Sequence, residues 1–177
     1  MARIPYKPTD ISEPAAVVSA IRKRRGGGLF NLDRMLLHSP PFAIGWNAFL
    51  GNVRRELDVS PKMCELAICA VAVINNADYE YKHHLPGFIT AGGNDEQVAA
   101  LPSLAAPDAD VSMFDSSERA VIALTREMTV NTTVSDETFA TVKAVFPDPQ
   151  HIVEIVGVIA TYNMVSRFLV TLGVEPE

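Results

Sequence analysis

Apolar residues recur at helical spacing over most of the chain, and no stretch of useful length alternates apolar and polar residues as a strand would. Pro, Gly and Asn/Asp breaks separate the helical stretches. We therefore expect an all-α bundle of about eight helices. The expected helical stretches are 12–25, 31–38, 40–53, 61–75, 78–91, 94–101, one that starts at 115 and carries its apolar stripe to 128, 135–146 and 150–172.

Capping residues mark most of the expected helix starts. Asn94 with Gln97, and Asp115 with Glu118, have the spacing of a capping box. Ser60 followed by proline is a further strong start. Other expected starts are at Ser12, Asn31, Asp78 and Ser135. Outside the helices, we expect residues 1–11 to form an extended arm and residues 102–114 to form a loop.

The helices at 61–75 and 150–172 are apolar nearly all round, which is typical of a central helix or of one in an interface. Apolar residues make up 48% of the chain. The mean hydropathy of +0.14 is high for a monomer of this size. We therefore expect a homo-oligomer whose subunits bury part of this apolar surface.

The length of 177 residues suits one globular unit. We expect an N-terminal arm and helix over 1–28 and a single domain over 29–175. The net charge of −6 argues against nucleic acid as the main partner. A basic run at 22–25 precedes three glycines, as expected at the end of a helix. Contact of this run with an anion, a membrane or nucleic acid stays open.

The chain shows no secretory leader and no run of 18 apolar residues, so we expect a cytoplasmic protein without a membrane span. Cys64 and Cys69 stand five residues apart on one expected helix and point in different directions. We expect both to be unbridged thiols of a reducing compartment.

Three ionisable residues in an apolar setting suggest proton-transfer chemistry. Glu65 lies inside the apolar stretch 61–75, and Glu80 and His84 are one turn apart on the next helix. If the two helices fold back on each other across the break at 75–78, these groups share one pocket. Two carboxylates and an imidazole in a dry pocket have coupled pKa values, which suits general acid/base catalysis.

Other readings of this cluster remain open. Glu80 and His84 could form a surface pair, and with Glu65 they could supply three zinc ligands, although no helical zinc motif is present. Further candidates for contact with a substrate are Tyr81, Arg34, His38, Trp46 and Arg167. Arg167 could instead pair with a glutamate, and Trp46 could belong to the core.

The segment ELAICAVAVINNADYEYKHH resembles the core motif of the carboxymuconolactone decarboxylase and AhpD-like superfamily. Members carry a Glu before an apolar helix and then a block (Asn/Ala)-x-Tyr-Glu-Trp-x-x-His, which here is Ala77 to His84 with Tyr81 in place of the tryptophan. The flanks NLDRMLLHSPPFAIGW and YNMVSRFLVTLGV resemble the same family, so the likeness covers about residues 29–175.

The resemblance implies an all-helical fold that assembles into dimers, trimers or hexamers. The alkylhydroperoxidase branch has cysteines at the positions of Ala77 and Glu80, and this chain has neither. We therefore expect a lyase that acts without cofactor or metal on a small carboxylated lactone or related acid. In it, His84 serves as acid/base, Glu80 orients it, and Glu65 relays the proton. A peroxidase-related antioxidant protein and a non-catalytic binder of small molecules are the alternatives.

Overall fold

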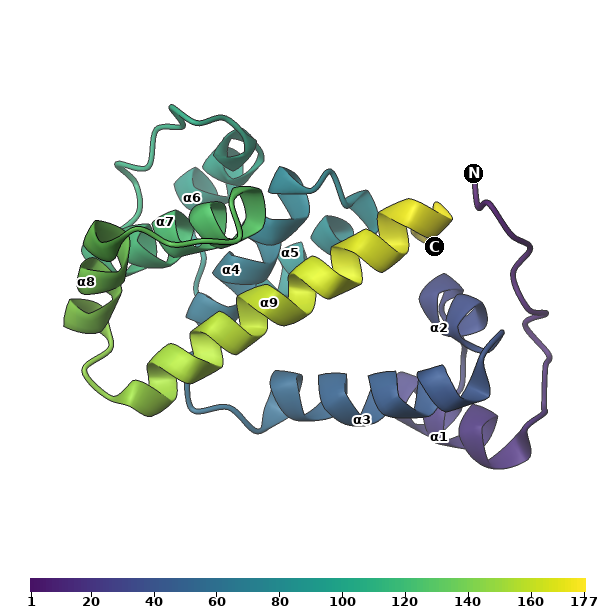
Figure 1. Cartoon of the computed structure of the whole chain (residues 1–177). Helices are drawn as coiled ribbons and strands as arrows, with labels where there is room; N and C mark the ends of the chain where they lie inside the picture. The colour runs from purple at the N-terminus through teal and green to yellow at the C-terminus, as the bar shows by residue number, and fades with distance from the viewer. The chain divides into compact units, whose positions relative to one another are not determined.

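The computed structural model describes residues 1–177 and contains nine α-helices, one 3-10 helix and no strand (Figure 1). The all-α prediction is confirmed. The helices are α1 (Ala15–Arg25), α2 (Asn31–Leu36), α3 (Pro40–Arg55), α4 (Pro61–Ile74), α5 (Asp78–Thr90), α6 (Asp95–Ala100), η1 (Leu101–Ala105), α7 (Ser116–Val130), α8 (Asp136–Val145) and α9 (Pro149–Leu172).

The chain forms two compact units. Unit 1 consists of Met1–Glu56 together with Leu169–Glu177, and unit 2 consists of Leu57–Phe168. The helix α9 begins in unit 2, and its last residues belong to unit 1. The sequence-based division at residue 28 stays a prediction.

The helix α4 is the centre of unit 2. The Ser60 side chain accepts a hydrogen bond from the Met63 backbone at 3.4 Å, which caps the helix as its sequence predicts. All residues from 66 to 72 are buried, and α4 packs against α5, α7 and η1. Phe88 of α5 and Phe114 before α7 join this core. The prediction that the apolar stretch 61–75 forms a central helix is confirmed for unit 2.

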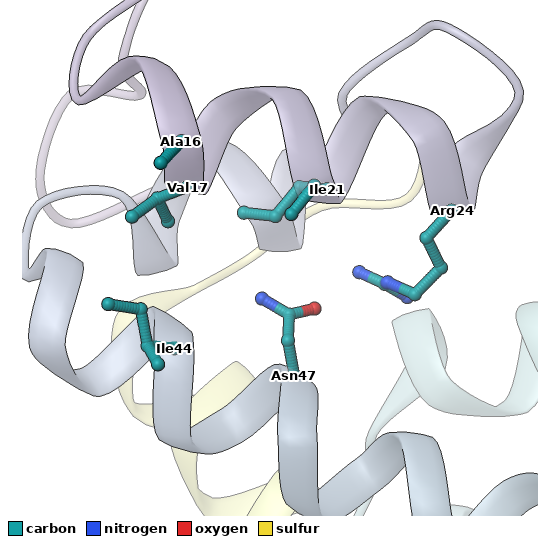
Figure 2. Close-up of a pocket in the computed structure, with 7 residues that line it drawn as sticks. Ala16, Val17, Ile21, Arg24, Ile44 and Asn47 are labelled. Atoms are coloured by element: carbon teal, nitrogen blue, oxygen red, sulfur yellow. The ribbon is translucent and has the colours of Figure 1, made fainter.

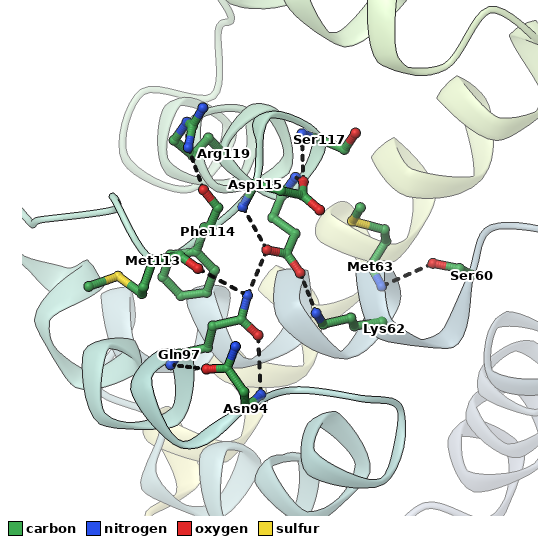
Figure 3. Close-up of polar contacts among 11 residues, drawn as sticks. Ser60, Lys62, Met63, Asn94, Gln97, Met113, Phe114, Asp115, Ser117 and Arg119 are labelled. Carbon is green, nitrogen blue, oxygen red and sulfur yellow. Dashed lines mark hydrogen bonds and ion pairs between the residues drawn. The ribbon is translucent and has the colours of Figure 1, made fainter.

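Both predicted capping boxes are present in unit 2. The Glu118 side chain also accepts hydrogen bonds from Gln97 Nε2 at 2.7 Å and pairs with Lys62 Nζ at 2.6 Å (Figure 3). Its carboxylate is 2% exposed, so it is a buried group compensated by two donors and a cation. The first turns of α4 and α7 and the helix α6 are tied together at this point.

Three helix starts differ from the sequence prediction. The helix α1 begins at Ala15 rather than near Ser12, because Pro14 is extended and Glu13 precedes a proline, which disfavours helical geometry at that residue. The Glu13 carboxylate accepts from the Ala15 backbone at 3.0 Å. Asn31 and Asp78 are the first helical residues of α2 and α5 rather than their caps.

In unit 1, the basic run ends α1 as expected, and Gly26 adopts the left-handed conformation with φ 74°. Arg24 and Arg25 pair with the buried Asp33 carboxylate at 3.0 and 2.9 Å. That carboxylate also accepts from the Phe30 backbone at 3.0 Å at the start of α2. One buried carboxylate therefore joins the end of α1 to the start of α2.

The two ends of the chain meet within unit 1. The Arg3 backbone donates to the Leu172 carbonyl at 2.9 Å, and the amino terminus pairs with Glu175 at 3.1 Å. The Tyr6 hydroxyl accepts from the Glu175 backbone at 2.9 Å. The N-terminal arm is therefore held by the last residue of α9 and by Glu175, which follows it.

The helix α9 has 24 residues and a mean hydropathy of 1.6 in its most apolar window. By length and composition alone it is the one helix that could cross a membrane. Half of that window is buried inside the protein, and a core helix meets the same criteria. A single helix of this kind is weak evidence for a membrane span.

Candidate active site

The helices α4 and α5 form a hairpin that joins Glu65 to His84. Asn76 adopts a positive φ of 54° between them, and the Ala77 backbone bonds to the Ala72 carbonyl at 2.8 Å. Across this hairpin the Glu65 Oε2 atom lies 2.8 Å from His84 Nδ1. The sequence-based prediction that the chain doubles back at 75–78 is confirmed.

Gly87 makes this contact possible. A Cβ atom on Gly87 would lie 2.8 Å from Glu65 Cδ and 3.0 Å from each of its carboxylate oxygens. The missing side chain leaves the space in which the Glu65 carboxylate rests against α5. Gly87 was not among the residues that the sequence pointed to, although a glycine inside a helix can indicate close packing.

The helix α9 supplies two further groups to the same site. The Tyr162 ring meets the His84 ring edge-on, with centroids 4.9 Å apart, and it is fully buried. The Ser166 hydroxyl donates to Glu80 Oε1 at 2.8 Å. Tyr162 and Ser166 are one turn apart, so one face of α9 contacts both His84 and Glu80. Ser166 was not among the residues that the sequence pointed to, because its partner lies far away along the chain.

The burial of the two carboxylates differs from the expectation. The Glu65 side chain is 24% exposed, rather than enclosed in a dry pocket, and it is paired with His84. It lies near the start of α4, before the fully buried part of that helix. Glu80 is the buried carboxylate, with 2% exposure, and His84 is 13% exposed. The site therefore has a dry side at Glu80 and a side open to solvent at Glu65.

The contact between Glu65 and His84 fixes the direction of the imidazole. An ionised carboxylate accepts hydrogen bonds and cannot donate them, so Nδ1 carries the proton when Glu65 is charged. Chemistry at His84 then takes place at the other ring nitrogen, Nε2. A carboxylate behind one nitrogen also stabilises the positive charge that the ring gains on protonation.

Both thiols of the chain lie on α4 and are free. Burial raises the pKa of Cys64 to about 11, and the charges of Glu65 and Glu154 add to the effect. Burial, Glu65 and Glu80 also raise the pKa of Cys69. Both thiols are therefore protonated at neutral pH, whereas a reactive cysteine needs a lowered pKa.

Two more predicted site residues lie in unit 2. The Tyr81 ring packs against the core cluster that contains Cys69 and Phe88. Arg167, which is exposed, donates to the backbone and side-chain oxygens of Asn163, each at 2.9 Å. Arg167 thus lies on α9 directly after Ser166, with its guanidinium anchored one turn back.

Three predicted substrate contacts belong to unit 1. Arg34 donates to the Lys7 carbonyl at 2.6 Å, and His38 Nε2 lies 2.7 Å from the Pro5 carbonyl. Both side chains therefore hold the N-terminal arm. Trp46 is 6% exposed and stacks at an angle on the Phe42 ring, with centroids 5.7 Å apart. Their assignment as substrate contacts stays a prediction.

No group of three or more His, Cys, Asp and Glu side chains is arranged to hold a metal ion. The zinc alternative at Glu65, Glu80 and His84 thus gains no support from the arrangement of these residues.

The model of the carboxymuconolactone decarboxylase family matches residues 40–127, which include Glu65, Glu80 and His84. The chain belongs to the carboxymuconolactone decarboxylase and AhpD-like superfamily. The motif that carries the resemblance in the sequence is therefore the part that the family model matches. A search of curated proteins gives no match.

Three solved structures of low sequence identity share this fold. A peroxidase-related protein from Ralstonia eutropha JMP134 superposes with a TM-score of 0.81 at 15% identity, over 99% of this chain and 92% of that one. A peroxidase-related protein from Silicibacter sp. TM1040 gives 0.77 at 16% identity, over 99% and 90%. The debrominase Bmp8, in complex with 2,3,4-tribromopyrrole, gives 0.75 at 14% identity, over 100% and 94%. These similarities establish the fold.

Proposed function

We propose that the protein is a lyase that needs no cofactor and removes a carboxyl group from a small lactone acid or related compound by general acid/base catalysis. The observation that carries the proposal is the 2.8 Å hydrogen bond from His84 Nδ1 to Glu65, which leaves Nε2 as the nitrogen for proton transfer. Membership of the carboxymuconolactone decarboxylase family supports this class of reaction.

In the proposed reaction, the bond between the substrate carbon and its carboxylate breaks, CO₂ leaves, and the electron pair stays on the substrate as a dienolate. The His84 imidazolium then donates its Nε2 proton to the carbon and regains a proton from solvent. Glu65 stabilises the imidazolium and keeps the ring aligned, so it has the orienting role that the sequence analysis gave to Glu80.

Glu80 has a different role in this proposal. Its carboxylate is buried and hydrogen-bonded to Ser166 beside the His84 helix face. A buried carboxylate near an imidazole favours the charged form of the ring, which is the proton-donating form. We assign the substrate carboxylate to Arg167, which follows Ser166 on α9 and can form a bidentate pair.

The thiols argue against the peroxidase alternative. Peroxide reduction needs a thiolate, and both Cys64 and Cys69 have raised pKa values because of burial and nearby carboxylates. The residues at the two positions where the peroxidase branch has cysteines are Ala77 and Glu80. A reaction based on proton transfer fits these residues better than one based on thiol oxidation.

The proposal is tested with carboxymuconolactone and a series of related lactone acids, by CO₂ release and by deuterium incorporation from D₂O. We expect His84→Ala to lower kcat by about 10²- to 10⁴-fold, the range for loss of a general acid/base, with unchanged thermal unfolding. In His84→Ala, the incorporation of deuterium at the carbon that carried the carboxyl group should be lost together with the release of CO₂.

The double variant Cys64→Ala, Cys69→Ala is the matched control and should keep its CO₂ release. Activity that vanishes in this variant, or that requires a peroxide and a thiol reductant, contradicts the proposal in favour of a peroxidase. Binding of the lactone acids without CO₂ release in the wild-type protein favours the non-catalytic binder instead.

A further inference from the structure

A cavity of about 280 Å³ lies between α1 and α3 in unit 1 (Figure 2). Its apolar lining includes Val17, Ala20, Ile21 and Ile44, and its polar lining consists of Arg24 and Asn47. Figure 2 shows the apolar side chains gathered toward one end, with the Asn47 amide and the Arg24 guanidinium facing each other at the other end. A cavity of roughly half this volume holds benzene in another protein, so one ring with polar substituents fits here.

The polar end contains two buried atoms that lack a hydrogen-bond partner, Arg24 Nε and Asn47 Oδ1. The Asn47 amide nitrogen donates to the Ala43 carbonyl at 2.7 Å, which fixes the amide with its oxygen as the unsatisfied atom. Buried polar atoms without partners are uncommon and costly, and each needs a physical reason. The polar end of the cavity therefore offers one hydrogen-bond donor, Arg24 Nε, and one acceptor, Asn47 Oδ1, next to an apolar space.

Several charged groups act on Arg24 at the same end of the cavity. The charged groups that act on Arg24 are Arg25, Arg54 and Asp33, and only Asp33 is negative. The Asp33 carboxylate is already engaged by Arg24, Arg25 and the Phe30 backbone. Burial and the charge of Arg25 lower the pKa of Arg24, and the charge of Asp33 acts in the opposite direction. An anion at Arg24 Nε would add a second counter-charge to that of Asp33.

We propose that this cavity binds a small organic hydroxy acid with a compact apolar body. The carboxylate accepts a hydrogen bond from Arg24 Nε, the hydroxyl donates to Asn47 Oδ1, and the apolar body fills the space against Ile21 and Ile44. The site lies wholly within unit 1, so it is separate from the site of the proposed lyase function and does not depend on it.

The test is isothermal titration of the full chain with three probes that differ by one group each. 3-Hydroxybenzoate carries both polar groups, benzoate lacks the hydroxyl, and 3-hydroxybenzyl alcohol lacks the charge. We expect benzoate to bind about threefold to tenfold more weakly than 3-hydroxybenzoate, and the neutral alcohol at least tenfold more weakly. Equal affinity for all three probes overturns the proposal.

Two pairs of variants locate the binding. Ala20→Phe fills the cavity from an exposed position, and Ser19→Phe adds the same bulk at an exposed neighbour outside the lining. Arg24→Gln removes the charge in the cavity, and Lys23→Gln removes one charge outside it. Thermal unfolding and circular dichroism establish that each variant folds.

The first variant of each pair should weaken 3-hydroxybenzoate binding at least tenfold, whereas its control should stay within twofold of the wild type. Unchanged affinity in Ala20→Phe places the probe elsewhere and overturns the proposal. Absence of probe binding, together with dissociation of an oligomer in Ala20→Phe, shows instead that a second copy of the chain fills the cavity.

Discussion

At the scale of single residues, Glu65 reaches His84 because residue 87 has no side chain. The space that a Cβ would need at Gly87 is taken by the Glu65 carboxylate, which is the far end of a flexible side chain. Such an end can move at low cost to the fold, yet the hydrogen bond at His84 Nδ1 depends on its position. A substitution at position 87 should therefore impair the proposed catalysis without lowering the stability of the protein.

The variant Gly87→Ala tests this separation. We expect its free energy of unfolding to stay equal or to rise by up to about 1 kcal/mol, because alanine is the better helix former. The displaced Glu65 should at the same time lower kcat for CO₂ release by about 10- to 100-fold, the usual effect of losing an orienting partner. Thermal unfolding and kcat of the same preparation measure the two effects.

Gly45→Ala is the matched control, because a Cβ there meets nothing within 4 Å on the exposed side of α3. It should gain similar stability and keep full activity. A Gly87→Ala protein with wild-type kcat would show that Glu65 does not orient His84.

The thiols give a pH-dependent prediction at the same scale. The pKa of Cys64 is about 11 because of burial and nearby carboxylates, against 9.0 for an ordinary thiol. Alkylation requires the thiolate, so the rate at Cys64 should rise with pH and be half-maximal near pH 11 in the folded protein. At pH 8 it should be about 100-fold slower than in the unfolded chain.

Iodoacetamide labelling with mass-spectrometric location of the modified residue gives these rates, and the same protein in urea is the control. Fast labelling of folded Cys64 at pH 7 to 8 would mean a lowered pKa. Such a result would restore the peroxidase alternative.

At the scale of the elements, features that depend on residues close together in the sequence could be predicted, and contacts between residues far apart in the sequence could not. The capping boxes at Asn94 and Asp115 each involve residues three apart, so their spacing alone predicts them. The start of α1 was misplaced because Pro14 constrains the residue before it more strongly than Ser12 can cap. Ser166 meets Glu80 across 86 residues of sequence, and no local pattern carries that information.

The buried carboxylate of Glu118 connects three elements of unit 2, as described above (Figure 3). In Glu118→Ala, the Gln97 amide loses its acceptor and Lys62 loses its counter-charge. We expect the free energy of unfolding to fall by about 3 to 5 kcal/mol, the range for breaking a buried ion pair. Urea unfolding followed by circular dichroism measures this loss.

Ser117→Ala, one residue away in the first turn of α7 and half-buried, is the control and should stay within about 0.5 kcal/mol of the wild type. An equally small change for Glu118→Ala would mean that the network contributes little to the stability of unit 2.

At the scale of the whole molecule, large apolar side chains remain exposed on helices of both units. Phe42, Ile44 and Phe49 of α3 are 46%, 55% and 50% exposed, and Val153 of α9 is 71% exposed. Phe42 and Phe49 are seven residues apart, so they lie on one face of α3, and a patch of exposed apolar side chains is typical of a surface that another chain covers. The expected oligomer is consistent with this exposure.

We predict that the protein sediments as a multiple of its 19.2 kDa chain mass at micromolar concentration. Sedimentation equilibrium measures this mass directly. The variant Phe49→Lys should reduce the mass or weaken the association, whereas Lys23→Gln, an exposed change on α1, should leave it unchanged. A wild-type protein that remains at the mass of one chain contradicts the expectation.

The meeting of the two chain ends within unit 1 has a consequence for biosynthesis. Residues 1–56 are translated before unit 2, but their unit also contains residues 169–177, which are translated after all of unit 2. A nascent chain therefore completes unit 2 before it can complete unit 1. Until residues 169–177 have left the ribosome, the N-terminal arm lacks its partners at Leu172 and Glu175 and stays open to proteases and chaperones.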